Sequence, residues 1–422
     1  MRSEMYPQPE LAEFYQHVRQ KTEALCKPLC IEDFGLQSMP DASPPKWHLA
    51  HTTWFFETLV LEKSLAGYQS FCPIFRVLFN SYYNAVGPQW ARSERGLLSR
   101  PTVEEVFAYR QHVDRAILSL LSGGLPAQCN RLITLGLHHE QQHQELILMD
   151  LKHAFARNPL RPEYAKPKQA NSGASPGGQN WIAISGGVFG FGHQDNGFCF
   201  DNEEPRHEVL MGDFEIADRM VTNLDYIEFI NDGGYQRPEF WLSDGWAMAE
   251  ADNWRLPLYW EAEKGGFSHF TLYGYQAVQP DMPVSHVSYY EADAFACWSR
   301  ARLPSEYEWE LATVRSGSKG TLMHDDQFQP RGLPSNVLDG KVHQLLGDLW
   351  EWTRSPYSPY PNYTPLPGAI GEYNGKFMCN QMVLRGGSFA TPEQHIRTTY
   401  RNFFPPHSRW MFSGIRLARN VG

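Results

Sequence analysis

The stretch that most constrains the fold of this chain is residues 135–150, which read LGLHHEQQHQELILMD. After Gly136 it contains neither glycine nor proline, and its apolar residues can form a buried stripe, so the sequence predicts a helix. On a helix, His139 and His143 lie on the same face, about 6 Å apart along the axis. Two imidazoles at this spacing can bind one metal ion from a single rigid element. The stretch therefore predicts part of a metal site.

The same residues leave the identity of the metal open. The segment from His139 to His143 reads HEQQH, which also satisfies the H-E-x-x-H pattern of zinc peptidases, with Glu140 as general base. Glu145 lies nearly opposite His143 on a helix and is a poor ligand, whereas Gln142 shares the face of the histidines. A surface helix that merely contains several histidines is the alternative. A third ligand from another element would decide between them.

The composition argues against several classes of partner. The formal net charge is -10 and no run of Lys or Arg occurs, which disfavours nucleic acid and anionic membranes. The 7 cysteines are odd in number and show no zinc-finger spacing, so no disulfide framework is expected. The N-terminal segment has no apolar signal core, and nowhere do about 18 apolar residues run together. We expect a soluble, cytoplasmic protein with small-molecule partners.

A chain of 422 residues favours two domains. Apolar residues recur at helical spacing over residues 11–25, 47–65 and 102–121, which together with 135–150 predict a four-helix bundle. Residues 166–180 are rich in Pro, Lys, Gly, Ser and Asn and are predicted to be a linker. We therefore expect one domain over 1–165 and a second over 181–422.

The second half has a different pattern, rich in Gly, Trp, Tyr, Phe and Pro. Short strand-like runs occur at 181–184 and 383–385, and only two clear helices are predicted, at 223–231 and 291–300. This half is expected to be a mixed domain with much irregular backbone.

The second predicted helix offers a third metal ligand. It contains WHLAHTTW at 47–54, in which His48 and His51 share a face. Either could bind a metal across the bundle. The alternative for each is a hydrogen-bonded histidine in a tryptophan-rich core.

The connector that follows carries two pairs of functional side chains. Tyr82 and Tyr83 are adjacent, and a phenol near a metal can donate a proton or an electron. Arg92 and Arg95 are three residues apart and can bind a carboxylate, although arginines on a solvated face are more common. Neither pair is specific by itself.

Seven motifs in the second half give a specific resemblance. They are GGVFGFG at 186–192, NEEPRH at 202–207, PVSHVS at 283–288, RLPSEYEWE at 302–310, GDLWEWT at 347–353, RGGS at 385–388 and GIR at 414–416. In this order they resemble the signatures of the formylglycine-generating-enzyme (sulfatase-modifying factor) fold. The first half resembles the DinB-like bundle, and the combination resembles the sulfoxide synthases (hercynine oxygenases) of ergothioneine biosynthesis and their ovothiol relatives. The expected fold class is α+β, a DinB-like four-helix bundle followed by a mixed, C-type-lectin-like domain.

The resemblance implies an iron enzyme. The family motif H-x3-H-x-E falls on His139, His143 and Glu145, and its earlier histidine ligand falls on His51. Three neutral histidines on one face of Fe(II) leave positions open for O2, a thiolate and an imidazole. The implied reaction joins the thiol of a cysteine-type substrate to the imidazole ring of hercynine (trimethylhistidine), with O2 also supplying the sulfoxide oxygen.

The resemblance also assigns residues to hercynine. Gln142 and Asn402 correspond to residues that bind it, and Phe403 and Phe404 offer ring faces to its trimethylammonium group. Relatives that use γ-glutamylcysteine have an Asp at the position of Phe404, where it can receive the glutamyl ammonium. The sequence therefore favours cysteine over γ-glutamylcysteine as the sulfur donor.

Two further roles follow from the same resemblance. Arg92 and Arg95 correspond to an arginine pair that holds the carboxylate of the thiol substrate, and Tyr82 or Tyr83 corresponds to the proton or electron donor. Ovothiol-type relatives, which use histidine and cysteine, commonly carry a methyltransferase domain after the second domain, whereas this sequence stops at Gly422. The ergothioneine branch is therefore expected, with the ovothiol-type synthase and the zinc peptidase as alternatives.

Overall fold

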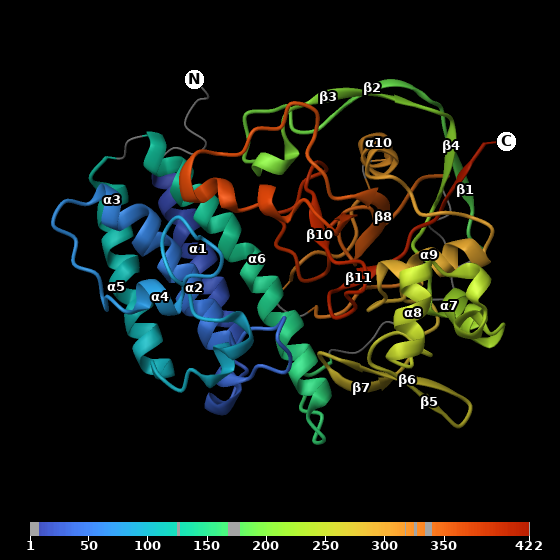
Figure 1. Cartoon of the computed structure of the whole chain (residues 1–422), viewed down its shortest axis with the longest axis horizontal. Helices are drawn as coiled ribbons and strands as arrows, with labels where there is room; N and C mark the ends of the chain where they lie inside the picture. Colours follow the sequence, from blue (N-terminus) through green and yellow to red (C-terminus); the bar gives the residue numbers. More distant parts are fainter. Residues whose placement is uncertain are drawn as a thin grey trace. The chain divides into compact units, whose positions relative to one another are not determined.

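The computed structural model describes residues 8–124, 127–167, 178–316, 318–324, 327–333 and 340–421. These residues form two compact units (Figure 1). The first unit comprises Met1–Leu160, Gln194–Asp201 and Thr364–Lys376, and the second comprises Arg161–His193, Asn202–Tyr363 and Phe377–Gly422. Two short segments that follow the predicted linker in sequence thus belong to the first unit. Most of that linker, residues 168–177, lies outside the described residues.

The first unit is a helical bundle, as predicted. Its helices are α1 (Gln8–Cys26), α2 (Pro45–Phe56), α3 (Glu62–Ser64), α4 (Phe75–Leu78), α5 (Val103–Ser122) and α6 (Ala127–Arg157). Helices α5 and α6 each pack against both α1 and α2 (Figure 1). The predicted helix at 135–150 is confirmed, and α6 extends beyond it at both ends.

The second predicted helix, 47–65, is not one uniform helix. A π-helical turn over Glu57–Leu61 separates α2 from α3. The buried carboxylate of Glu57 accepts hydrogen bonds from Tyr109 Oη at 2.7 Å, Tyr68 Oη at 2.8 Å and the Phe71 amide at 3.0 Å. These bonds tie the turn to α5 and to the chain that follows α3. An apolar pattern does not distinguish an α-helical turn from a π-helical one, so the π-helical turn could not be predicted from the sequence.

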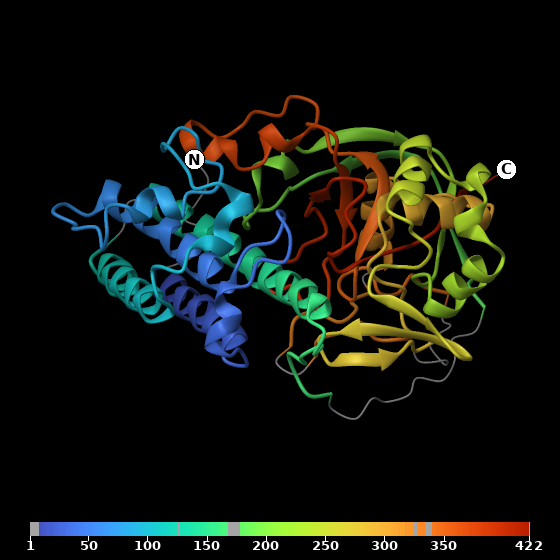
Figure 2. The ribbon, with the colours of Figure 1, turned by 60° about the horizontal axis from the view of Figure 1, so that its bottom comes forward.

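Within the described residues, the second unit contains four small sheets and four α-helices. The strands are β1 (Trp181–Ile184), β2 (Gly187–Phe191), β3 (His207–Met211), β4 (Phe214–Ala217), β5 (Trp260–Glu263), β6 (Gly266–Thr271), β7 (Gly274–Ala277), β8 (Trp350–Pro356), β9 (Met382–Arg385), β10 (Asn402–Phe404), β11 (Ser413–Gly414) and β12 (Ala418–Asn420). The sheet orders are β1-β4-β12, β10-β9-β8-β11, β2-β3 and β5-β6-β7, the last of which is drawn as yellow arrows in Figure 2. The helices are α7 (Asn223–Asn231), α8 (Ser243–Ala251), α9 (Tyr289–Trp298) and α10 (Glu306–Ser316). The α+β fold class and the strands predicted at 181–184 and 383–385 are confirmed.

The prediction of only two clear helices in this half was wrong, because α8 and α10 are also present. Helix α10 begins after a capping box, in which Ser305 Oγ accepts from the Glu308 amide at 3.1 Å and the Glu308 carboxylate accepts from the Ser305 amide at 2.7 Å. Its S-x-x-E signal was present within the fourth motif. Helix α8 contains Gly245, a weak helix former, where an added Cβ would lie 2.7 Å from Tyr290. Close packing, which the local sequence does not reveal, explains that glycine.

Buried ion pairs hold the irregular backbone of the second unit together. Arg416 Nη2 lies 2.7 Å from Glu351 Oε1, and both side chains are fully buried. Arg401 Nε lies 2.8 Å from Glu306 Oε2, also buried. The acidic partners and Arg416 belong to the motifs on which the resemblance rests, so these motifs have a structural role. Within the described residues, no helix has the length and apolar character needed to cross a membrane.

Candidate metal centre

Three buried histidines lie together in the first unit. His51 comes from α2, His139 and His143 come from α6, and their candidate ligand atoms all lie within 4.8 Å of one another. The Nε2 atoms of His139 and His143 are 3.0 Å apart. Two nitrogens bound to one ion at about 2.1 Å and at right angles to each other are also separated by about 3.0 Å. The donor set therefore fits a single metal ion.

The environment of His51 leaves one of its nitrogens available. Its Nδ1 lies 2.6 Å from the carbonyl oxygen of Phe79, directly after α4. Because a carbonyl only accepts, Nδ1 carries the proton and Nε2 carries a lone pair. This Nε2 is buried and has no hydrogen-bond partner among the described residues. The imidazole stacks with Trp47 at 4.5 Å and with Trp54 at 5.6 Å between ring centroids. Packing thus fixes the ring while leaving Nε2 free to bind a metal.

The three imidazoles are held in the neutral form. Burial lowers the pKa of His139 to about 3. Burial, followed by the neighbouring His139, also lowers the pKa of His51 and of His143. A neutral imidazole is the form that binds a metal, since a protonated one has no lone pair to donate.

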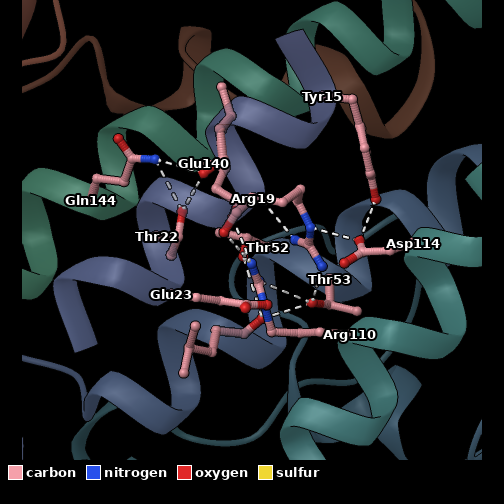
Figure 3. A network of polar contacts seen from close by, with 12 residues as sticks. Tyr15, Arg19, Thr22, Glu23, Thr52, Thr53, Arg110, Asp114, Glu140 and Gln144 are labelled. Carbon is pink, nitrogen blue, oxygen red and sulfur yellow. Dashed lines mark hydrogen bonds and ion pairs between the residues drawn. The ribbon is translucent and has the colours of Figure 1, made fainter. Parts of the chain in front are cut away.

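Glu140 is bound by two arginines (Figure 3). Its Oε2 lies 2.7 Å from Arg19 Nη1 of α1, and its Oε1 lies 3.0 Å from Arg110 Nη2 of α5. All three side chains are buried. Burial alone raises the pKa of Glu140, but the two guanidinium charges bring it below the ordinary value of 4.5. Both oxygens of the carboxylate therefore form ion pairs with arginines of the bundle, which argues against Glu140 as the general base of a peptidase.

Gln142 contacts a residue that the sequence analysis missed. The hydroxyl of Tyr373 donates a hydrogen bond to Gln142 Oε1, and the Tyr373 ring lies 5.5 Å from that of His139. Tyr373 follows a short 3-10 helix in which Glu372 accepts from the Ala85 amide at 2.8 Å. Tyr373 and Gln142 are 231 residues apart, and an isolated tyrosine in an irregular segment carries no periodic signal. The structure therefore adds a phenol beside the histidine group.

The two predicted tyrosines stack on each other, with ring centroids 4.7 Å apart. Tyr83 is fully buried and lies 5.5 Å from Trp54, which itself stacks on His51. Tyr82 lies 6.2 Å from Tyr373. Burial raises the pKa of both Tyr82 and Tyr83, so that both keep their protons at neutral pH. The structure thus brings three phenols into the neighbourhood of the histidines.

The two predicted arginines have different environments. Arg95 is buried, its guanidinium lies 3.3 Å from the centre of the Trp47 ring, and burial lowers its pKa to about 9. It donates to Ser43 Oγ at 2.9 Å and to Ser81 Oγ at 3.0 Å, and it forms no ion pair with a carboxylate of the described residues. Arg92 is exposed and donates to the carbonyl of Asp41. Arg95 is therefore the buried cation that can receive an anionic group.

The remaining predicted residues lie on β10 of the second unit. Asn402 Oδ1 accepts from the Phe403 amide at 2.9 Å. Phe403 stacks on Tyr357 with ring centroids 4.0 Å apart, and Phe404 meets Trp410 edge to face at 5.8 Å. Asn402, Phe403 and Phe404 are each partly exposed, so the strand presents polar and aromatic surface.

Comparisons with known proteins match both halves of the chain. Residues 15–154 match the DinB superfamily, and residues 167–341 and 332–421 match the sulfatase-modifying factor enzyme 1-like domain. The chain is 31% identical over 403 residues to the hercynine oxygenase of Mycobacterium tuberculosis, covering 90% of this chain and 92% of that protein. It is 30% identical over 445 residues to the hercynine oxygenase of Mycolicibacterium thermoresistibile, covering 96% and 94%.

The second half also resembles a different enzyme. The formylglycine-generating enzyme of Thermomonospora curvata is 26% identical over 291 residues, covering 56% of this chain and 92% of that protein. The two relatives that cover 90% or more of this chain carry the name hercynine oxygenase, and the predicted resemblance is confirmed. The chain belongs to the hercynine oxygenase family.

Proposed function

We propose that this protein is an Fe(II)- and O2-dependent sulfoxide synthase that joins the thiol of cysteine to the imidazole ring of hercynine in ergothioneine biosynthesis. The observation that carries the proposal is the group of three buried, neutral histidines in a chain of this family. Iron held by His51, His139 and His143 would keep positions open for O2 and substrate and would supply the redox chemistry that zinc lacks.

The proposed reaction balances without an external reductant. A C–H bond of the imidazole and the S–H bond of the thiol are lost, and a C–S bond forms. One oxygen atom of O2 becomes the sulfoxide oxygen, and the other leaves as water with the two hydrogens. Oxidative coupling and sulfur oxidation each release two electrons, which together match the four that O2 accepts.

We assign hercynine to residues suited to a zwitterion with a quaternary ammonium group. Gln142 offers an amide beside the histidine group, and Asn402 on β10 is the second amide that the resemblance assigns to hercynine. Phe403 and Phe404 offer aromatic faces, which bind trimethylammonium groups through cation–π contacts. The similarity of the chain to hercynine oxygenases supports this assignment.

The thiol substrate is assigned to the arginine pair. Arg95 is a buried cation held by hydroxyl groups, so a substrate carboxylate would supply the missing negative charge. Arg92 is the second, exposed member of the pair. Tyr82, Tyr83 and the newly found Tyr373 are the candidate donors of a proton or an electron, because each phenol is protonated or lies beside the histidine group.

The alternatives differ in substrate and metal. An ovothiol-type synthase would use histidine in place of hercynine with the same iron site. A zinc peptidase would need Glu140 near the metal, and the ion pairs of Glu140 with Arg19 and Arg110 oppose that role.

The first prediction concerns the metal. Protein isolated under reducing conditions with iron is expected to contain about one iron per chain and to form the sulfoxide from hercynine, cysteine and O2. The variants His51→Ala, His139→Ala and His143→Ala are each expected to lose iron and turnover, because each removes one nitrogen ligand. Metal analysis and mass spectrometry of the product are the measurements.

His17→Ala is the matched control, since this histidine is exposed on α1. It should keep both iron and activity. Full occupancy by zinc, with activity indifferent to iron and oxygen, would overturn the proposal in favour of a peptidase. Faster turnover with histidine than with hercynine would move the protein to the ovothiol-type reaction.

A further inference from the structure

A fourth histidine connects the histidine group to a buried carboxylate. His48 Nδ1 lies 2.7 Å from His143 Nδ1, and His48 Nε2 lies 3.1 Å from Asp150 Oδ2. The same Oδ2 accepts a hydrogen bond from the Ser43 amide at 2.8 Å. His48, His143 and Asp150 are all buried. A continuous chain of hydrogen bonds therefore runs from Asp150 through His48 to His143.

The carboxylate fixes the direction of every hydrogen bond in this chain. A carboxylate only accepts, so His48 Nε2 carries the proton of that ring. A neutral imidazole has a single N–H, so His48 Nδ1 is an acceptor. It must then receive the proton of His143 Nδ1, which leaves the lone pair of His143 on Nε2. That nitrogen is the one that lies 3.0 Å from His139 Nε2.

The opposite arrangement is unfavourable. If His48 donated through Nδ1, its Nε2 lone pair would face the Asp150 carboxylate at 3.1 Å, and two acceptors would repel each other. His143 would then carry its proton on Nε2, where it would block metal binding. His51, by contrast, is oriented by the neutral carbonyl of Phe79. Of these two ligands, His143 is thus the one whose orientation depends on a charged group.

We propose that Asp150, acting through His48, is a positioning residue that holds His143 in the tautomer whose Nε2 faces the metal. This inference rests on the metal site of the proposed function and adds residues outside its ligand set. A carboxylate behind a ligand histidine also makes the imidazole a stronger donor, and removing such a partner typically costs about ten- to a hundred-fold in metal affinity. The intervening histidine transmits this effect over two hydrogen bonds.

The test uses the full chain, stripped of metal and titrated with Co(II), whose absorption bands report its ligands. Asp150→Leu removes the acceptor with little change in volume, and His48→Asn keeps an acceptor near His143 but cannot reach Asp150. Each variant is expected to bind Co(II) about ten- to a hundred-fold more weakly, with shifted absorption bands. Because the residues act in one chain, the double variant should bind no more than about two-fold more weakly than His48→Asn alone.

His153→Gln is the matched control, because His153 lies on the same helix and bonds Ser38 Oγ at 2.6 Å. It should keep the affinity and the bands of the unmodified protein. Thermal unfolding monitored by circular dichroism confirms that each variant is folded at the titration temperature.

Two results would overturn the proposed positioning role of Asp150. One is an Asp150→Leu variant that loses less than about five-fold in Co(II) affinity and keeps its bands, and the other is a double variant in which the losses multiply. Failure of the proposed function is a different outcome, because the unmodified protein would then bind Co(II) through the three histidines yet form no sulfoxide.

Discussion

The environment of Glu140 distinguishes two interpretations of the segment from His139 to His143, a zinc peptidase motif and part of an iron site. Glu140 follows His139 directly in sequence, but a turn of about 100° per residue directs it toward α1 and α5 instead of the histidine group. There it neutralises Arg19 and Arg110, and Arg19 also contacts Asp114 at 2.8 Å. Glu140 thus stabilises the bundle that holds the metal ligands, and we expect it to have no direct part in turnover.

The Glu140→Gln variant tests this role. Removing one partner of a buried ion-pair network leaves charge uncompensated and typically costs about 3–5 kcal/mol. The free energy of unfolding in urea is expected to fall by about this amount, while folded protein keeps its metal. The exposed Glu104→Gln of α5 is the control, with a change within about 0.5 kcal/mol. A stable Glu140→Gln variant that selectively loses activity would contradict the structural role.

The same variant has a predicted pH dependence. In the folded protein burial alone raises the pKa of Glu140, yet Arg19 and Arg110 bring it below 4.5. A carboxyl group with a lowered folded pKa stabilises the fold above its unfolded pKa, and that stabilisation is lost as pH falls through the folded value. The difference in unfolding free energy between the unmodified protein and Glu140→Gln should therefore shrink as the pH is lowered below about 4.5.

At the scale of elements, the approach of α2 and α6 creates the histidine group. Gly136 of α6 makes it possible, since an added Cβ would lie 2.6 Å from a ring carbon of Phe56 and 2.8 Å from Phe55. These two residues end α2, and His51 lies one helical turn before Phe55. A side chain at position 136 therefore forces either the rings or the helices apart.

Gly136→Ala is expected to weaken metal binding. Overpacking typically costs about 1–3 kcal/mol, while the better helix propensity of Ala returns about 1 kcal/mol, so overall stability should change little or fall modestly. Metal affinity should fall more clearly, because His51 moves away from His139 and His143. Titration of metal-free protein measures this, with Gly35→Ala as the control, where the added Cβ meets nothing within 4 Å. Unchanged affinity would show that the helices can move without disturbing the ligands.

Elements were predicted best from the sequence where apolar residues keep one helical spacing over a long segment. The bundle helices and the pair His139 and His143 followed from spacing alone, and the choice of His51 over His48 came only with the resemblance. The π-helical turn, α8 and the position of Tyr373 depend on contacts between distant segments, which leave no local pattern. The tautomers of His51 and His143 also depend on the tertiary partners Phe79, His48 and Asp150.

At the scale of the whole molecule, the two units contribute different functions in the proposed reaction. The histidine group, the three phenols and Arg95 all belong to the first unit, so metal binding is expected to be independent of β10. Asn402, Phe403 and Phe404 belong to the second unit and are proposed to act on the substrates. Substitutions on β10 should therefore change substrate use and leave the metal content unchanged.

The choice of sulfur donor tests whether β10 affects substrate use without affecting metal binding. Phe404 is partly exposed and has no charge to offer the ammonium group of γ-glutamylcysteine, so cysteine should be preferred in competition at equal concentration. Phe404→Asp supplies a charge-assisted partner worth about 1.5–3 kcal/mol, which should shift the ratio of kcat/KM toward the dipeptide by roughly ten- to a hundred-fold. In Phe404→Asn the side chain has nearly the shape of Asp but no charge, so this variant should shift the ratio of kcat/KM much less. Iron content should be equal in all three proteins. If the unmodified protein already prefers the dipeptide, or if Asp and Asn act alike, another group receives the ammonium and the assignment of Phe404 is wrong.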